Sequence, residues 1–134
     1  MKNEFGFILV KPQLGENIGA CARSMKNFGF SKLHIVSPKI NFPNHKAKAM
    51  SVGAYDIINK TKVFKETNEA ISNFDIVVSL SARRRDINKK HISLNGFVKL
   101  IKTNKQSNFG LMFGPEASGL SNEDLSFSNY VLQI

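Results

Sequence analysis

Two short segments of the chain carry residue types that could bind an anionic group. In residues 15–23 (Gly-Glu-Asn-Ile-Gly-Ala-Cys-Ala-Arg), Gly19 and Arg23 stand four residues apart and would share one face of a helix. A glycine near a helix N-terminus lets an anion approach the backbone, and a guanidinium one turn further on can clamp a phosphate. The same spacing fits a surface arginine beside a glycine at a tight helix crossing. The residues alone leave both interpretations open.

The second segment begins at residues 79–86 (Ser-Leu-Ser-Ala-Arg-Arg-Arg-Asp) and runs on to Lys89 and Lys90. Small residues at the end of a strand leave room for a ligand, and the arginines beyond could reach RNA phosphates. A solvated basic loop is the alternative, since most charge runs are exposed.

A third segment, residues 113–120 (Phe-Gly-Pro-Glu-Ala-Ser-Gly-Leu), contains two glycines and a proline around Glu116. This composition predicts a stiff turn that exposes backbone groups and presents a carboxylate. An ordinary turn into a following helix would have the same composition, so the pattern alone is a weak signal.

Several kinds of site lack support in the sequence. Neither a G-x-x-x-x-G-K-[ST] nor a G-x-G-x-x-G segment follows any predicted strand, which argues against ATPase and NAD-binding functions. The histidines His34, His45 and His91 show no ligand spacing with each other or with Cys21, so we expect no metal site. Cys21 is the single cysteine, and its apolar helical neighbours favour a packed thiol over a nucleophile.

Composition limits the class of protein. The 134 residues suit one domain, and 19 Lys and Arg against 10 Asp and Glu give a formal net charge of +9. Such a charge favours polyanionic partners, although lysines spread along the chain also fit a solvated basic surface. The sequence has neither a run of apolar residues long enough to cross a membrane nor a signal-peptide pattern, so we expect a cytoplasmic protein.

Strand-like and helix-like segments alternate along the chain, which predicts an α/β fold: a mostly parallel, Rossmann-like sheet with helices on both faces. Ligands bind such sheets at the carboxyl ends of the strands, where loops beginning at Lys11, Ser37, Ser81 and Gly114 would meet. We expect strands over residues 5–10, 33–36, 62–64, 76–80, 109–113 and 130–134. We expect helices over residues 17–28 with Asn17 as N-cap, 44–51, 67–73 capped by Thr67, 94–102, and a short one opened by a capping box at Ser121.

The last predicted strand ends at Ile134, where the sequence stops. A doubly wound sheet normally places a helix after each strand, and here that helix would still have to follow. We therefore expect residues 1–134 to form a single domain that is incomplete at its C-terminus. A second chain covering the exposed face is the alternative.

Four segments together resemble the SpoU/TrmH family of the SPOUT superfamily, which are RNA ribose 2′-O-methyltransferases. Residues 17–29 resemble the family's first motif almost position for position, and residues 49–56 are similar to its middle segment. Residues 81–85 resemble its (T/S)AR-x-R stretch, and residues 113–123 its second motif. The likeness covers essentially the whole chain and is greatest to the bacterial TrmJ-like enzymes, the tRNA (cytidine/uridine-32-2′-O)-methyltransferases.

The resemblance implies an α/β domain with a trefoil knot that acts as a homodimer and uses S-adenosylmethionine. It implies cofactor contacts, largely through the backbone, at Leu80, Ser81, Ala82, Gly114 and Ile134. It also implies that Asn17, Arg23 and Glu116 place or activate the ribose. The segment resembling the (T/S)AR-x-R stretch and the lysines after it supply the expected RNA contacts: Arg83, Arg84, Arg85, Lys89 and Lys90.

Two features qualify what the resemblance implies. The family's third motif, a Ser-Leu-Asn segment on a final helix that closes the cofactor pocket and completes the knot, is missing from the sequence. Arg23 corresponds to the proposed activator of the 2′-hydroxyl, but a guanidinium is nearly impossible to deprotonate in a protein. Orienting the hydroxyl and an adjacent phosphate is a compatible role for Arg23.

The leading hypothesis is therefore an S-adenosylmethionine-dependent 2′-O-methyltransferase acting on tRNA, with rRNA as a second candidate substrate. A truncated, inactive remnant that at most binds RNA is the main alternative. A flavodoxin-like nucleotide binder is a third hypothesis, which rests only on the alternation of strands and helices.

Overall fold

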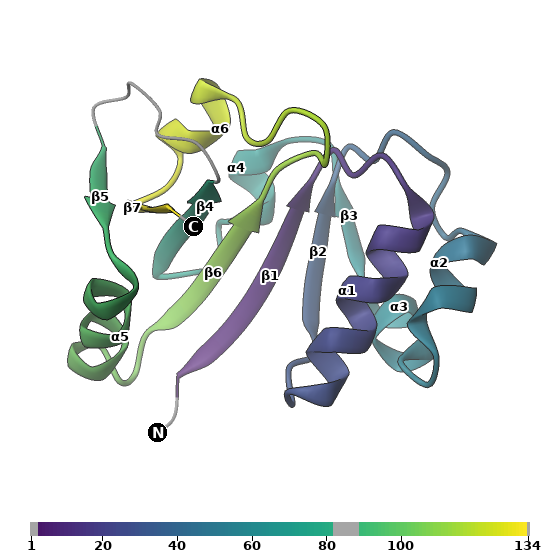
Figure 1. The fold of residues 1–134 in the computed structure, drawn as a ribbon, viewed down its shortest axis with the longest axis horizontal. Helices are drawn as coiled ribbons and strands as arrows, with labels where there is room; N and C mark the ends of the chain where they lie inside the picture. The colour runs from purple at the N-terminus through teal and green to yellow at the C-terminus, as the bar shows by residue number, and fades with distance from the viewer. Residues whose placement is uncertain (1–2, 82–88, 134) are drawn as a thin grey trace.

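The computed structural model describes residues 3–81 and 89–133. Within that part, seven strands form one sheet in the order β3-β2-β1-β6-β4-β7-β5, and every neighbouring pair is parallel (Figure 1). The strands are β1 Glu4–Val10, β2 Lys32–Val36, β3 Lys62–Phe64, β4 Ile76–Ser81, β5 Lys90–Ile92, β6 Asn108–Phe113 and β7 Tyr130–Gln133. The helices are α1 Gly15–Asn27, α2 His45–Ser51, α3 Tyr55–Lys60, α4 Thr67–Ala70, α5 Leu94–Thr103 and α6 Asn122–Ser126. The prediction of a parallel α/β fold is confirmed.

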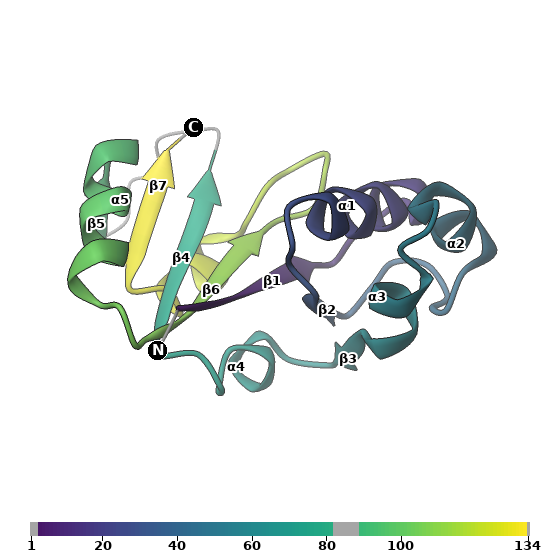
Figure 2. The same cartoon turned by 90° about the horizontal axis from the view of Figure 1, so that it is seen from below.

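Apolar residues line both faces of the central strands, which is why helices cover both sides of the sheet. In β1, Phe7 and Leu9 pack with α1, α2 and α3, whereas Ile8 and Val10 pack toward α4 and α6 on the other face. Figure 2 shows α1 and α4 on opposite sides of the sheet. Helix α5 covers the β4–β7 region but contributes no fully buried residue, and Leu94 at its start is 67% exposed.

The start of α1 differs from the prediction. The helix begins at Gly15 with Leu14 as its N-cap, so the prediction that Asn17 is the cap was wrong. Leu14 has an extended backbone and makes no side-chain cap; the N–H groups of Gln13 and Leu14 instead donate to the carboxylate of Glu116. The backbone before α1 is thus held by a residue about a hundred positions away in sequence, and such a contact leaves no local signal.

Some of the other predicted helix caps are confirmed and others are wrong. Ser121 caps α6 through its side chain, as predicted, and Asn44 caps α2 in the same way, which the sequence analysis did not predict. Thr67 does not cap α4: Glu66 is the N-cap, in a capping box with Glu69, and the Thr67 hydroxyl donates to Asp124 at 2.8 Å. Helix α3 and strand β5 were not predicted. None of the helices in the described ranges is long and apolar enough to span a membrane.

Candidate cofactor and substrate site

The predicted cofactor residues meet at the carboxyl edge of the sheet. Ser81 of β4 lies opposite Gln133 of β7, and Ser79 pairs with Met112 of β6, so the ends of β6, β4 and β7 lie side by side. This register brings Leu80, Ser81 and the start of the turn at Gly114 together. Ala82 and Ile134 fall outside the described residues.

The turn at residues 114–119 is held by its own backbone. The N–H of Gly119 donates to the carbonyl of Pro115 at 2.8 Å, and Gly119 has a φ of +71°. A Cβ atom on Gly114 would collide with the backbone of Gly119 and Leu120. Gly114 is therefore required because the turn folds back on itself, and this stiffens the turn beside the strand ends.

A carboxylate clamp joins this turn to the start of α1. Glu116 accepts hydrogen bonds from the Gln13 N–H at 3.0 Å, the Leu14 N–H at 3.2 Å and the Asn17 side-chain amide at 2.8 Å. Gln13 also binds the turn through its side chain, whose oxygen accepts a hydrogen bond from the Ala117 N–H at 3.1 Å. Sequence analysis missed Gln13, for which spacing gave no signal.

The clamp also sets the ionisation of Glu116. Partial burial raises the pKa of the carboxyl, but the hydrogen bonds from Asn17, Gln13 and Leu14 outweigh that effect and lower the pKa below its ordinary value of 4.5. The positive end of the α1 dipole acts in the same direction. Glu116 is thus an ionised group whose lone pairs are already engaged, which suits positioning better than proton removal.

The structure brings Asn17 and Glu116 together but does not bring Arg23 to them. Arg23 lies six residues after Asn17 on α1, which is about 9 Å along the helix and roughly 120° around it. Arg23 is exposed and forms no hydrogen bond or ion pair with any described residue.

Gly19 serves the crossing of two helices. A Cβ atom on Gly19 would collide with the carbonyl of Ala47 and come within 2.8 Å of the Met50 Cβ and 3.0 Å of the Ser51 nitrogen, all in α2. Gly15 meets Asn44, the N-cap of α2, in the same way. Of the two interpretations that the sequence left open, the tight helix crossing is the one seen.

Comparison with known proteins adds the family. A model of the SpoU rRNA Methylase family matches residues 4–134. The chain belongs to that family. It is 36% identical over 131 residues to the tRNA (cytidine-2′-O-)-methyltransferase TrmJ of Methanocaldococcus jannaschii. That alignment covers 95% of this chain and 56% of the relative. It is 34% identical over 135 residues to the tRNA (cytidine/uridine-2′-O-)-methyltransferase TrmJ of Sodalis glossinidius. That alignment covers 100% of this chain and 52% of the relative.

A solved structure agrees with the SpoU assignment. The crystal structure of TrmJ from Z. mobilis ZM4 superposes with a TM-score of 0.90 at 32% identity, over 96% of this chain and 57% of that one. The resemblance inferred from the sequence and the SPOUT fold are therefore confirmed. The chain spans about half the length of the curated relatives it matches.

Of the residues predicted to bind RNA, the structure describes only Lys89 and Lys90. Arg83, Arg84 and Arg85 lie outside the described residues. Lys90 is not in a loop: it opens β5, pairs with Tyr130 of β7, and holds its ammonium 6.0 Å from the Tyr130 ring centroid. The preceding residue, Lys89, accepts a hydrogen bond from the His91 ring through its carbonyl at 3.0 Å.

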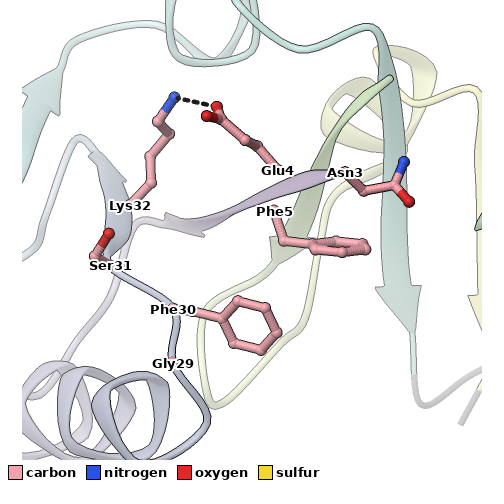
Figure 3. Close-up of a pocket in the computed structure, with 7 residues that line it drawn as sticks. All are labelled: Asn3, Glu4, Phe5, Gly29, Phe30, Ser31 and Lys32. Carbon is pink, nitrogen blue, oxygen red and sulfur yellow. Dashed lines mark ion pairs between the residues drawn. The ribbon is translucent and has the colours of Figure 1, made fainter. Parts of the chain in front are cut away.

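Three other features concern the described part of the chain: a cavity, the thiol of Cys21 and possible metal ligands. A cavity of about 330 Å³ lies at the amino ends of β1 and β2 (Figure 3), but its Glu4 and Lys32 pair with each other at 3.7 Å. Burial raises the pKa of the Cys21 thiol to about 11, which keeps it protonated and fits a packed thiol. In the described part of the chain, no group of three or more His, Cys, Asp and Glu could hold a metal ion.

Proposed function

We propose that this chain is the catalytic domain of an S-adenosylmethionine-dependent RNA ribose 2′-O-methyltransferase that acts on tRNA. The observation that carries the proposal is the clamp between Glu116 and the start of α1, which fixes the 114–119 turn beside the ends of β4 and β7. The relatives named above are tRNA 2′-O-methyltransferases and support this function over an inactive remnant. Membership of the SpoU family argues against a flavodoxin-like nucleotide binder.

The residues at the strand ends fit a purine-containing methyl donor. Leu80 and Phe113 are half-buried apolar side chains, and because Ser79 pairs with Met112 they share one face of adjacent strands. Backbone groups at Ser81 and Gly114 follow directly, so apolar surface and polar backbone lie together, as in most cofactor sites. When bound there, S-adenosylmethionine would supply an electrophilic methyl group. Ala82 and Ile134 remain proposed contacts that rest on the family resemblance.

Positioning supplies much of the proposed rate acceleration, because methyl transfer from a sulfonium is an in-line displacement. The Asn17 amide donates to Glu116 and is thereby oriented, which leaves its oxygen able to accept a hydrogen bond from a ribose hydroxyl. Glu116 holds this arrangement in place. Arg23 contributes by orienting a phosphate or the hydroxyl, since its guanidinium stays charged.

We further propose that the family's homodimer applies to this chain. Arg23 lies about 9 Å along α1 and roughly 120° around it from Asn17 of its own chain, so a second copy is one way to bring a guanidinium to a ribose. Two exposed apolar side chains, on separate elements, are available for contacts with that copy: Phe28 after α1, 78% exposed, and Leu94 at the start of α5, 67% exposed. Light scattering on the purified protein tests this, with the mass of one chain contradicting it.

The function is tested by incubating the purified protein with S-adenosylmethionine carrying an isotopic label in its methyl group and an unmodified tRNA transcript. Nucleoside analysis should show label in 2′-O-methylnucleosides. Arg23→Ala should abolish labelling while leaving cofactor affinity unchanged. Label on a base instead of a ribose, or normal turnover by the Arg23→Ala variant, would contradict the proposed chemistry.

A further inference from the structure

Three lysines follow three adjacent strands at the carboxyl edge of the sheet. Lys11 comes directly after β1, Lys65 directly after β3, and Lys39 lies three residues after the end of β2. The strands are neighbours in the order β3-β2-β1, and all three lysines are exposed. Neighbouring strands lie about 4.8 Å apart, so the row extends over about 10 Å. We call Lys11, Lys39 and Lys65 the lysine edge.

Hydrogen bonds between the loops fix the backbone of the lysine edge. The Lys11 N–H donates to the Val36 carbonyl at 2.7 Å, and the Lys39 N–H donates to the Pro12 carbonyl at 2.9 Å. The Ser37 hydroxyl donates to the Lys65 carbonyl at 2.7 Å. The three positions are therefore tied to one another across strand ends and are not independent surface lysines.

Two residues of this edge adopt a strained backbone. Lys11 has a φ of +50° and Ser37 a φ of +41°, in the left-handed region that side chains other than glycine disfavour. Such strain persists where the surrounding structure fixes it, and it occurs preferentially at binding and active sites. Glycine at position 11 would remove the strain, yet the residue there is a lysine.

The lysine edge adjoins the site of the proposed reaction. Lys11 lines a cavity of about 280 Å³ together with three residues of the 114–119 turn, namely Pro115, Ser118 and Gly119. Two residues further along, Gln13 holds that turn through Glu116 and Ala117. An RNA strand bound along the lysine edge would thus lead to the turn that Glu116 positions.

No described acidic side chain forms an ion pair with a lysine of the lysine edge. None of the three lysines forms an ion pair in residues 3–81 and 89–133, where the recorded pairs are Lys26–Asp56 and Lys32–Glu4. The acids beside Lys65 are engaged elsewhere, because Glu66 and Glu69 form the capping box of α4. Asp124 also lines the cavity, but its two oxygens accept from Thr67 and Ser121.

We propose that the lysine edge binds the ribose-phosphate backbone of the substrate RNA next to the nucleotide that is methylated. Regularly spaced cations on a rigid edge suit regularly spaced phosphates, and such contacts position a strand without reading its bases. The inference rests on the proposed function for the identity of the polyanion. It adds a second RNA-binding surface, on β1–β3, to the predicted one that follows β4.

The test is the salt dependence of binding to an unmodified tRNA transcript, compared between the wild type and a variant carrying Lys11→Gln, Lys39→Gln and Lys65→Gln. Each lost phosphate contact should reduce the magnitude of the slope of log K against log salt by about 0.7–0.9, so the magnitude should fall by about 2.1–2.7 in the triple variant. A matched control replaces the exposed lysines of the α5 region, Lys99, Lys102 and Lys105, with Gln and removes the same charge. An unchanged slope in the edge variant, or an equal loss in the control, would overturn the proposal.

Two further variants separate binding from folding. Arginine at all three positions keeps the charge and should retain the wild-type slope. Lys11→Gly relieves the backbone strain, so its melting temperature should rise while its salt slope falls by about 0.7–0.9; a wild-type slope in this variant would count against the proposal. Wild-type protein that binds RNA but transfers no methyl group would refute the proposed function alone, because the slopes test the lysine edge independently.

Discussion

At the scale of single residues, the site depends on one carboxylate that links two segments of the chain through hydrogen bonds. Glu116 accepts hydrogen bonds from the backbone N–H groups of Gln13 and Leu14 and from the side-chain amide of Asn17. It therefore joins a turn and a helix that are about a hundred residues apart in sequence. Those hydrogen bonds are strongest when the group is ionised, since a protonated carboxyl is a poorer acceptor. The clamp is therefore expected to be sensitive to pH.

Glu116→Gln tests the clamp through stability. Because folding lowers the pKa of Glu116, its contribution is complete above its ordinary pKa of 4.5 and is lost as the pH falls through the lowered value. At neutral pH we expect the variant to lose about 1 kcal/mol of unfolding free energy, a modest loss because this exposed group is screened by solvent.

Urea unfolding of both proteins between pH 7 and pH 3 measures that contribution. The difference between wild type and variant should stay constant above pH 4.5 and shrink below it. A difference that grows as the pH falls would show that Glu116 is not held in its ionised form.

At the scale of elements, the crossing of α1 and α2 sets where α1 begins, and hence where the clamp forms. Gly19 packs against α2 so closely that an added methyl group has no space. Gly19→Ala should destabilise the fold by about 1–3 kcal/mol, because α2 must shift to admit the methyl group.

Gly96→Ala is the matched control for the crossing. Gly96 is also in a helix, but its Cβ would meet only the Ser93 hydroxyl at 3.4 Å and the Ile92 Cβ at 3.5 Å. This variant should gain up to about 1 kcal/mol from helix propensity. Thermal unfolding distinguishes the two, and equal effects would show that the crossing is not tight.

The elements also show how far the sequence predicts the structure. The mostly apolar sequence of β4 and the alternation of strands and helices predict the parallel sheet, because buried strands and their covering helices leave strong patterns. Helix α3 has six residues and no side-chain N-cap to mark its start, and strand β5 has only three residues. β5 also opens with Lys90, so it resembles the end of a basic loop, and it is defined only by its pairing with β7.

The same distinction holds for the candidate site. Asn17, Ser81, Gly114 and Glu116 lie at the carboxyl edge of the sheet, where the motifs predict them, because the ends of parallel strands and the starts of the following helices share that edge. The roles of Gln13 and of Gly19 depend on contacts between segments far apart in sequence, which no local pattern contains.

At the scale of the whole molecule, the parallel sheet gathers one ligand-binding edge from distant parts of the chain. The ends of β4, β6 and β7 offer apolar and backbone groups, while the ends of β1, β2 and β3 offer lysines. The 114–119 turn and its clamp lie where these two halves meet. This arrangement suits an enzyme that brings a small methyl donor to a polyanionic substrate.

The most direct test of this account is the affinity of the purified protein for S-adenosylmethionine, measured by isothermal titration calorimetry for the wild type and Glu116→Ala. The account predicts saturable binding to the wild type. It also predicts at least a tenfold loss, about 1.4 kcal/mol, in the variant, because the turn is no longer fixed beside the strand ends. Absence of binding to the wild type, or equal affinity in the two proteins, would contradict the claim that the clamped turn forms the cofactor site.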